Sequence, residues 1–164
     1  MGTGCFYRLD MSQAERIMFI QGLDVDGVEV TLSESDELED LDWNRISELV
    51  ESFSFVTVHS PIKVDFDSNN EDLIRRIEEF REEIGAETAV FHPDRVENIE
   101  LLDNIEASIE NMQSRKGFDR QDLEKFLQDG FPVVVDTVHA DTWENNGFPD
   151  EKQHLLEKYD ERIS

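Results

Sequence analysis

The chain has 164 residues and a formal net charge of -25, because 40 Asp and Glu oppose 15 Lys and Arg. Its hydrophobic content of 38%, with 11 Phe, is enough for the core of one folded domain and argues against general disorder. So acidic a surface repels phosphate backbones and anionic lipid, which makes nucleic acid an unfavourable partner. The lone Cys5 excludes an internal disulfide and a cysteine-cage zinc site.

No stretch approaches the roughly 18 consecutive apolar residues that a membrane span requires. The opening residues also lack the basic and apolar regions of a signal peptide, so the expected location is the cytoplasm.

The excess of acid is spread along the whole chain, as in proteins from salt-loving organisms. High ionic strength screens the self-repulsion that would otherwise loosen such a fold. We therefore expect the melting temperature to rise between dilute buffer and several molar KCl. A melting temperature that does not respond to KCl would contradict this interpretation.

Short β-branched or aromatic runs alternate with amphipathic helical patterns along the chain. The runs that predict strands are 4–9, 27–32, 55–59, 88–92, 105–111 and 132–136. The patterns that predict helices are 12–22, 43–53, 73–84, 119–130 and a segment starting near 150. Ser12 and Glu15 match a capping box, Gly85 matches a helix stop, and Ile17 and Met18 are expected on the core face of the first helix. Strict alternation predicts one α/β domain over residues 1–164, with a parallel sheet covered by helices.

Three of the four histidines follow a predicted strand directly or end one: His59, His92 and His139. Glu110 and Asp136 lie at the same level on the fifth and sixth runs. The loops at the carboxyl ends of parallel strands converge, and active sites are built there. Imidazole and carboxylate together suit Zn, Mn, Fe or Co, so these five residues predict a site for one or two divalent ions.

Each member of this set also has an ordinary structural interpretation. A single histidine at a strand end is usually a hydrogen-bonded residue, and Glu110 or Asp136 alone would be a common capping or solvated group in so acidic a chain. The joint pattern carries the metal prediction. The fourth histidine, His154, is predicted to be a surface residue of the last helix.

Four segments carry these residues in a characteristic order: Val58-His59-Ser60-Pro61, Val90-Phe91-His92-Pro93, Ser108-Ile109-Glu110-Asn111-Met112 and Val134-Val135-Asp136-Thr137-Val138-His139-Ala140. Together they resemble the xylose isomerase-like TIM-barrel superfamily, which contains endonuclease IV and the sugar phosphate isomerases and epimerases. The resemblance implies that His59 and His92 are metal ligands, as in the endonuclease branch. It implies that Glu110 is a ligand and, in epimerases, the catalytic base, that Asp136 is a ligand, and that His139 is a ligand or substrate contact.

The chain departs from that superfamily in its number of repeats. A family barrel has eight βα units, whereas about six are predicted here, so the expected fold is an incomplete TIM-barrel-like repeat. A further histidine and a final glutamate of the family have no counterpart. Unpaired first and last strands would expose apolar faces, for which we expect a homodimer or a partner that completes the barrel; the functional gene product could also be longer.

Three functions remain open from the sequence. The first is a metal-dependent sugar or sugar-phosphate isomerase or epimerase, in which Glu110 abstracts a proton next to a carbonyl. The second is a degenerate barrel that has become a binding or assembly module. The third is a phosphodiesterase resembling endonuclease IV, which keeps both His59 and His92 as ligands.

Four further residues are candidates for contacts with the substrate. Lys63, Arg95 and Arg115 lie just beyond strand ends and could anchor an anionic group, although solvated cations are about as common there. Glu29 lies between Val28 and Val30 in the second predicted strand, where it faces either the barrel interior or a polar helix. An inward Glu29 could replace the missing carboxylate.

Overall fold

The computed structural model describes residues 1–6, 9–111, 120–136, 139 and 150–159. Five parallel strands form one sheet in the order β1-β2-β3-β4-β5, so each strand pairs with the next one along the chain. The strands are β1 (Gly27–Thr31), β2 (Phe55–His59), β3 (Thr88–Phe91), β4 (Ala107–Glu110) and β5 (Val133–Val134). The predicted α/β class and parallel βα repeat are therefore confirmed, whereas a TIM barrel stays a prediction.

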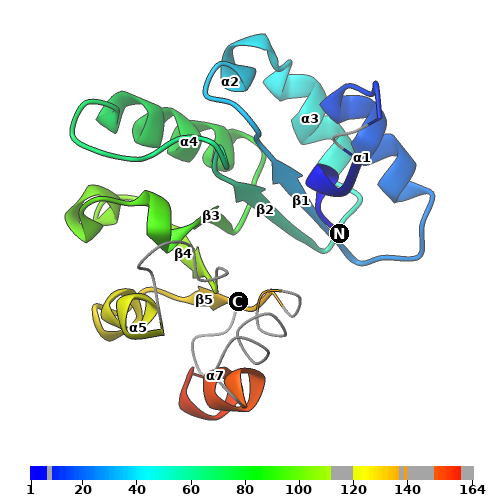
Figure 1. Cartoon of the computed structure of the whole chain (residues 1–164). Coiled ribbons are helices and arrows are strands. Elements are labelled where there is room, and N and C mark those ends of the chain that lie inside the picture. Colours follow the sequence, from blue (N-terminus) through cyan, green and yellow to red (C-terminus); the bar gives the residue numbers. More distant parts are fainter. Residues whose placement is uncertain (7–8, 112–119, 137–138, 140–149, 160–164) are drawn as a thin grey trace.

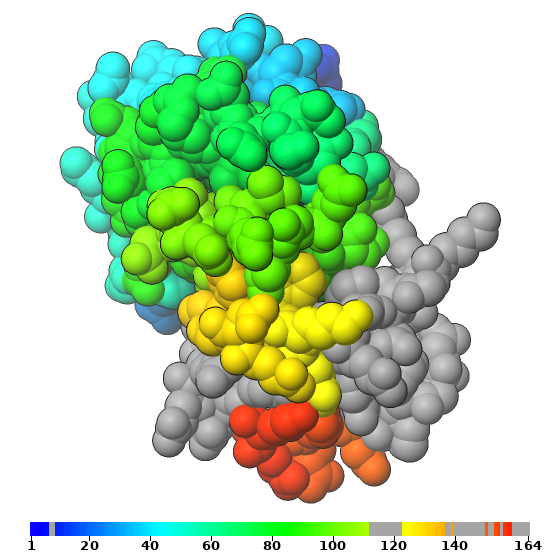
Figure 2. All heavy atoms as spheres, turned by 90° about the vertical axis from the view of Figure 1, so that its left-hand side faces the viewer, coloured from blue at the N-terminus to red at the C-terminus, as the bar shows by residue number. Residues whose placement is uncertain are grey.

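Helices follow the strands and wrap around the outer side of the curved sheet (Figure 1). They are α1 (Gln13–Gln21), α2 (Glu37–Asp40), α3 (Trp43–Val50), α4 (Glu71–Glu83), α5 (Arg120–Gln128) and α7 (Glu151–Tyr159). Short 3-10 turns are η1 (Thr3–Phe6), η2 (Pro93–Arg95) and η3 (Ile99–Leu102). In Figure 2, which shows one face of the molecule, the green surface around α4 lies above the yellow α5 and the red α7. No helix among the described residues is long and apolar enough to cross a bilayer.

The two faces of the sheet differ in chemistry because side chains alternate along each strand. The helix-covered face carries the buried residues Val28, Val30, Val56, Val58, Ala89, Phe91, Ala107, Ile109 and Val133. The opposite face, on the inner side of the curve, carries Glu29, Thr31, Thr57, His59, Thr88, Ser108 and Glu110. Apolar burial against the helices therefore holds the sheet, while the inner face is free to carry polar chemistry.

The helices supply the other half of this core, each from one row of apolar side chains that faces the sheet. The buried residues of these rows are Ile17, Ile20, Ile46, Leu49, Val50, Ile74, Ile77, Phe80, Leu123 and Leu127. On α1, Ile20 rather than the predicted Met18 faces the core, and Met18 is 44% exposed. The prediction for Met18 was wrong because Ile17 and Ile20, three residues apart, already fill that side of the short helix.

The first predicted strand, 4–9, is also wrong in the part that the structure describes. Residues Thr3–Phe6 form the η1 turn, and residues 7–8 lie outside the described residues. Gly2 makes a single parallel bridge to Glu29 instead. A Cβ on Gly4 would lie 3.0 Å from the Thr31 side chain, so glycine lets the chain bend closely over β1.

The predicted helix start at Ser12 is confirmed as a capping box. The Ser12 hydroxyl accepts a hydrogen bond from the Glu15 backbone N–H at 3.3 Å, and the Glu15 carboxylate accepts one from the Ser12 N–H at 2.8 Å. At the end of α4, Gly85 has φ +68°, as the predicted helix stop requires.

Replacement of Ser12 by alanine is expected to lower the free energy of unfolding by about 1 kcal/mol, because the first turn of α1 loses its acceptor. Urea titration at constant salt measures the difference, with the exposed Ser35→Ala as a control. Equal effects of the two substitutions would contradict a role for the cap.

Candidate metal centre

His59, His92 and Glu110 meet at the carboxyl edge of the sheet. His59 ends β2, His92 follows β3, and Glu110 ends β4, so neighbouring strands place the three side chains together. Glu110 Oε2 lies 3.2 Å from His59 Nε2 and 2.7 Å from His92 Nε2. The two imidazole rings meet edge to face with their centroids 4.6 Å apart. The sequence prediction that these groups share one mouth of the fold agrees with this placement.

The hydrogen bonds of His59 show what this cluster lacks. His59 Nδ1 lies 2.8 Å from the Ser60 carbonyl oxygen, which only accepts, so Nδ1 carries the proton of this bond. In a neutral His59, Nε2 then points a lone pair at the carboxylate of Glu110, which is a second acceptor. A second proton on His59, a proton on Glu110 or a cation between the two groups relieves this conflict. The donor set therefore fits a metal ion.

Burial makes that conflict costly. His59 is 5% exposed and Glu110 is 7% exposed, while the His92 side chain is 12% exposed and its buried Nδ1 has no hydrogen-bond partner. Buried polar atoms usually have partners, and a missing one calls for an explanation. A metal bound through Nε2 leaves Nδ1 as the nitrogen that an outer hydrogen bond normally orients.

The pKa values of the three groups follow from burial and mutual contact. Burial raises the pKa of Glu110, but hydrogen bonds and charge from His59 and His92 outweigh it and hold the pKa well below the usual range. Burial lowers the pKa of His59, but the contacts with Glu110 and the charge of Glu29 raise it by more, so the net shift is upward. Burial dominates for His92, whose pKa is lowered. The cluster therefore favours an ionised Glu110.

Asp136 and His139 approach the same carboxylate from beyond β5. His139 Nδ1 lies 3.6 Å from Glu110 Oε1 and has no hydrogen-bond partner, and the His139 N–H donates to Asp136 Oδ1 at 3.0 Å. Asn111, which is fully buried, donates from Nδ2 to the Asp136 carbonyl at 2.8 Å. Asn111 was not among the predicted site residues, although it follows Glu110 directly.

Two groups of ligand atoms thus share Glu110. One group is His59, His92 and Glu110, and the other is Glu110, Asp136 and His139, with the ligand atoms of each group within 4.8 Å of one another. The two oxygens of Glu110 face different groups. Five predicted ligands are therefore brought together in an arrangement that could hold one ion in each group, with Glu110 between them.

The predicted anion anchors are engaged by acids. Lys63 pairs with Glu34, and Arg95 Nη1 pairs with Asp65 Oδ1 at 2.6 Å. Beside Arg95, the loops after β2 and β3 are joined by a backbone bridge. Arg115 lies outside the described residues. Arg95 is thus bound into a link between two loops at the edge that carries His59 and His92.

Glu29 lies on the inner face, as one of its two predicted orientations requires. It pairs in register with Thr57, two residues before the Thr31–His59 pair. Its Oε1 accepts a hydrogen bond from the Thr31 hydroxyl at 3.3 Å. Burial raises its pKa despite the charge of His59.

His154, predicted to be a surface residue of the last helix, is partly buried and has a partner. Its Nε2 lies 3.0 Å from Glu124 Oε1, which also accepts from Lys158 at 2.8 Å. The contact joins α7 to α5 and leaves the His154 side chain 27% exposed. The partner, Glu124, belongs to α5, which contacts β4. The sequence alone could not predict this contact, because the two residues are 30 positions apart.

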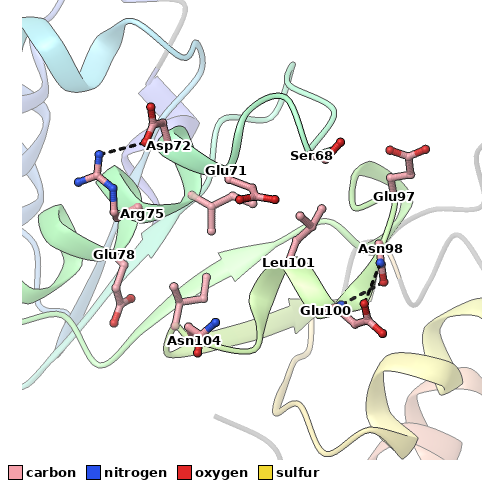
Figure 3. A pocket seen from close by; sticks show the side chains of 12 residues that line it. Ser68, Glu71, Asp72, Arg75, Glu78, Glu97, Asn98, Glu100, Leu101 and Asn104 are labelled. Carbon is pink, nitrogen blue, oxygen red and sulfur yellow. Dashed lines mark hydrogen bonds and ion pairs between the residues drawn. The ribbon is translucent and has the colours of Figure 1, made fainter.

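A large groove lies away from this centre, between α4 and the η3 turn (Figure 3). Its volume is about 1010 Å³, and Glu71, Glu78, Glu97 and Glu100 line it. The guanidinium of Arg75 is paired there with Asp72 at 3.2 Å. So many carboxylates make this groove unsuitable for an anionic substrate.

Acid should destabilise the metal-free protein through this cluster. The pKa of Glu110 is lower in the folded than in the unfolded protein. Ionised Glu110 therefore stabilises the fold at pH values above its unfolded pKa, near 4.5, and this stabilisation is lost as the pH falls below it. His92 also has a lowered pKa, so its contribution to stability is lost as the pH falls below 6.5. The pKa of His59 is raised, so its contribution is present at low pH and is lost as the pH rises. We expect the melting temperature in EDTA to fall more steeply with acid in the native chain than in Glu110→Gln. Equal slopes would exclude this role of Glu110.

No protein-family model and no curated protein matches this chain. Among solved structures, it is similar to one described as "The crystal structure of AsfvAP:AG", with a TM-score of 0.61 and 11% sequence identity. The match covers 99% of this chain and 70% of that chain. At this identity the similarity concerns the fold alone, and function must be argued from the site.

Proposed function

We propose that the protein is a divalent-metal-dependent enzyme that hydrolyses a small phosphate ester. The observation that carries the proposal is the position of Glu110 between two groups of ligand atoms. Its Oε2 faces His59 and His92, and its Oε1 faces His139. A carboxylate used on both sides in this way suits a ligand shared by two ions.

Divalent ions at these ligands would supply Lewis acidity toward a phosphoryl oxygen and a water made acidic enough to attack at neutral pH. The chain supplies their orientation. Ser60 fixes the His59 ring through Nδ1, and Asn111 fixes the backbone at Asp136. Ligands held from behind in this way keep their geometry when the substrate arrives.

The charge of the protein limits the substrate to a small molecule. A net charge of -25 opposes the long polyanion of DNA, and Lys63 and Arg95 are already paired with acids. A single phosphate ester, including a sugar phosphate, needs only the cations of the site.

A sugar or sugar-phosphate isomerase or epimerase is the second candidate, and Glu29 is the observation that favours it. Glu110 is a poor base, because its two imidazole contacts hold its pKa low. Glu29 has a raised pKa on the same inner face and interacts electrostatically with His59 and Glu110. Proton abstraction beside a carbonyl would therefore be assigned to Glu29 rather than to Glu110.

The test begins with protein purified in high salt, whose metal content is measured by elemental analysis. We expect divalent metal, together with metal-dependent release of p-nitrophenol from p-nitrophenyl phosphate or its bis ester. Glu29→Gln should leave this hydrolysis in place. Turnover of aldose or ketose phosphates that Glu29→Gln abolishes, without ester hydrolysis, would favour the isomerase. A protein that takes up no added metal would instead favour a non-catalytic binding or assembly module.

The oligomeric state belongs to the same proposal. Within the described residues, the strand pairing runs from β1 to β5 and does not close into a ring. We propose that a second copy covers the open side, since symmetric pairing is the commonest assembly. Light scattering on the sample used for metal analysis gives the mass, and a monomer would exclude the dimer.

A further inference from the structure

A second cavity surrounds the starts of β1 and β2, and none of the residues that line it belongs to the two groups of metal ligands. Its volume is about 560 Å³, within the range of small-molecule pockets. Glu29 and Thr57 line it from adjacent strands, and Val134 lines it from β5. The chain terminus at Met1 lies beside the start of β1 (Figure 1), and Met1 is one of the residues that line the cavity.

The cavity combines apolar walls with negative charge at two depths. Val25, Phe55 and Val134 supply the apolar surface. Asp24 and Asp26 are exposed and precede β1, whereas Glu29 lies within β1 and is largely buried. The acids thus occupy a rim and an interior position, with apolar surface beside them.

Glu29 is an expensive group to bury in such a place. Its Oε1 has the Thr31 hydroxyl as a partner, and the backbone packs against it so closely that a Cβ on Gly2 would lie 2.9 Å away. Burial of a carboxylate disfavours its charged form, which raises the pKa of Glu29. A cation entering the cavity would restore the balance by pairing with this carboxylate.

One cationic group of the protein already lines the cavity, but it does not balance the charge of the carboxylates there. The α-ammonium of Met1 donates to the Gly27 carbonyl at 2.9 Å. Three carboxylates line the cavity with this one ammonium, so two negative charges remain for a ligand to neutralise.

We propose that this cavity binds a short aliphatic diamine. One ammonium group pairs with Glu29 in the interior, the methylene chain lies along Phe55 and its apolar neighbours, and the second ammonium pairs with Asp24 and Asp26 at the rim. The shape and the chemistry both argue for such a ligand, because a bare inorganic cation would leave the apolar walls and most of the volume unused.

Calorimetric titration with 1,4-diaminobutane at constant ionic strength tests the proposal. Butylamine has one charge and 1,4-butanediol has none, so the series separates the two poles from the apolar body. We expect the diamine to bind about tenfold more tightly than butylamine, and the diol to show no binding, because each charge-assisted contact adds to the affinity.

Variants then place the binding in the cavity. Glu29→Gln should weaken diamine binding about tenfold, and Asp24→Asn with Asp26→Asn should reduce the diamine to the affinity of butylamine. Asp40→Asn, at the exposed end of α2, removes an equal charge elsewhere and should change nothing. An equal loss in Asp40→Asn, an unchanged Glu29→Gln, or binding of the diol would overturn the proposal.

Two measurements keep this test independent of the others. Far-UV circular dichroism checks that each variant is folded, and the two aspartates are exposed loop residues whose amides should not disturb the fold. Metal content measured on the same samples reports on the metal ligands, none of which lines the cavity. Loss of diamine binding with metal retained, or the reverse, shows which of the two proposals has failed.

Discussion

Replacement of Glu110 by alanine is expected to empty both groups of metal ligands at once. Glu110 is the member that the two groups share, since its Oε2 faces His59 and His92 and its Oε1 faces His139. We expect metal affinity to fall by about 100-fold or more, and metal-dependent turnover to be lost with it. Elemental analysis after dialysis and metal titration both measure the loss.

Two comparisons make this result specific to a shared ligand. Asp136→Ala removes a member of one group only, so part of the metal should remain. Glu106→Ala removes an exposed carboxylate just before β4 and should leave metal binding intact. If Glu110→Ala and Asp136→Ala lose the same amount of metal, Glu110 is not shared between two ions.

The largest loss of stability is expected from Phe91→Ala. Phe91 ends β3 on the helix-covered face, is fully buried, and meets Phe66 edge to face with ring centroids 5.2 Å apart. Truncation leaves a cavity and removes an aromatic contact, which together lower the free energy of unfolding by about 3–5 kcal/mol. Urea denaturation in constant high salt measures the change.

Phe55→Ala is the matched control, because Phe55 begins β2 and is 36% exposed. Phe55→Ala should lower the free energy of unfolding clearly less than Phe91→Ala does. Similar midpoints for the two variants would mean that the helix-covered face does not form the main core.

The sequence predicted most of the fold because strand and helix periods are local. The run at residues 55–59 became β2 at those bounds, and the apolar stripe of α4 ended at Gly85 as predicted. The first run failed because Gly2 and Gly4 let the backbone press against the side chains of β1. Such a contact between distant segments leaves no periodic signal.

The site was predictable where the alternation of side chains along a strand and the position of the strand end decide which way a residue points. His59, His92 and Glu110 fall on one face of neighbouring strands, and they do meet. The ion pairs of Lys63 and Arg95 were not predictable in this way, because their acidic partners lie 29 and 30 residues away in the chain. In a chain with 40 acidic residues, sequence alone does not select the one that a given cation will reach.

The shortness of β5 has a consequence for cooperativity. Among the described residues of β5, Val133 and Val134 pair with β4, and Asp136 and His139 lie beyond the end of this strand. In the metal-free protein, β5 has a shorter ladder than the other described strands, so we expect its pairing with β4 to open before theirs. An ion held between Glu110 and these residues would bind only the form in which β5 is paired, and by linkage it would stabilise the pairing of β5 with β4. The fraction of molecules in which β5 is open would then depend on the metal concentration.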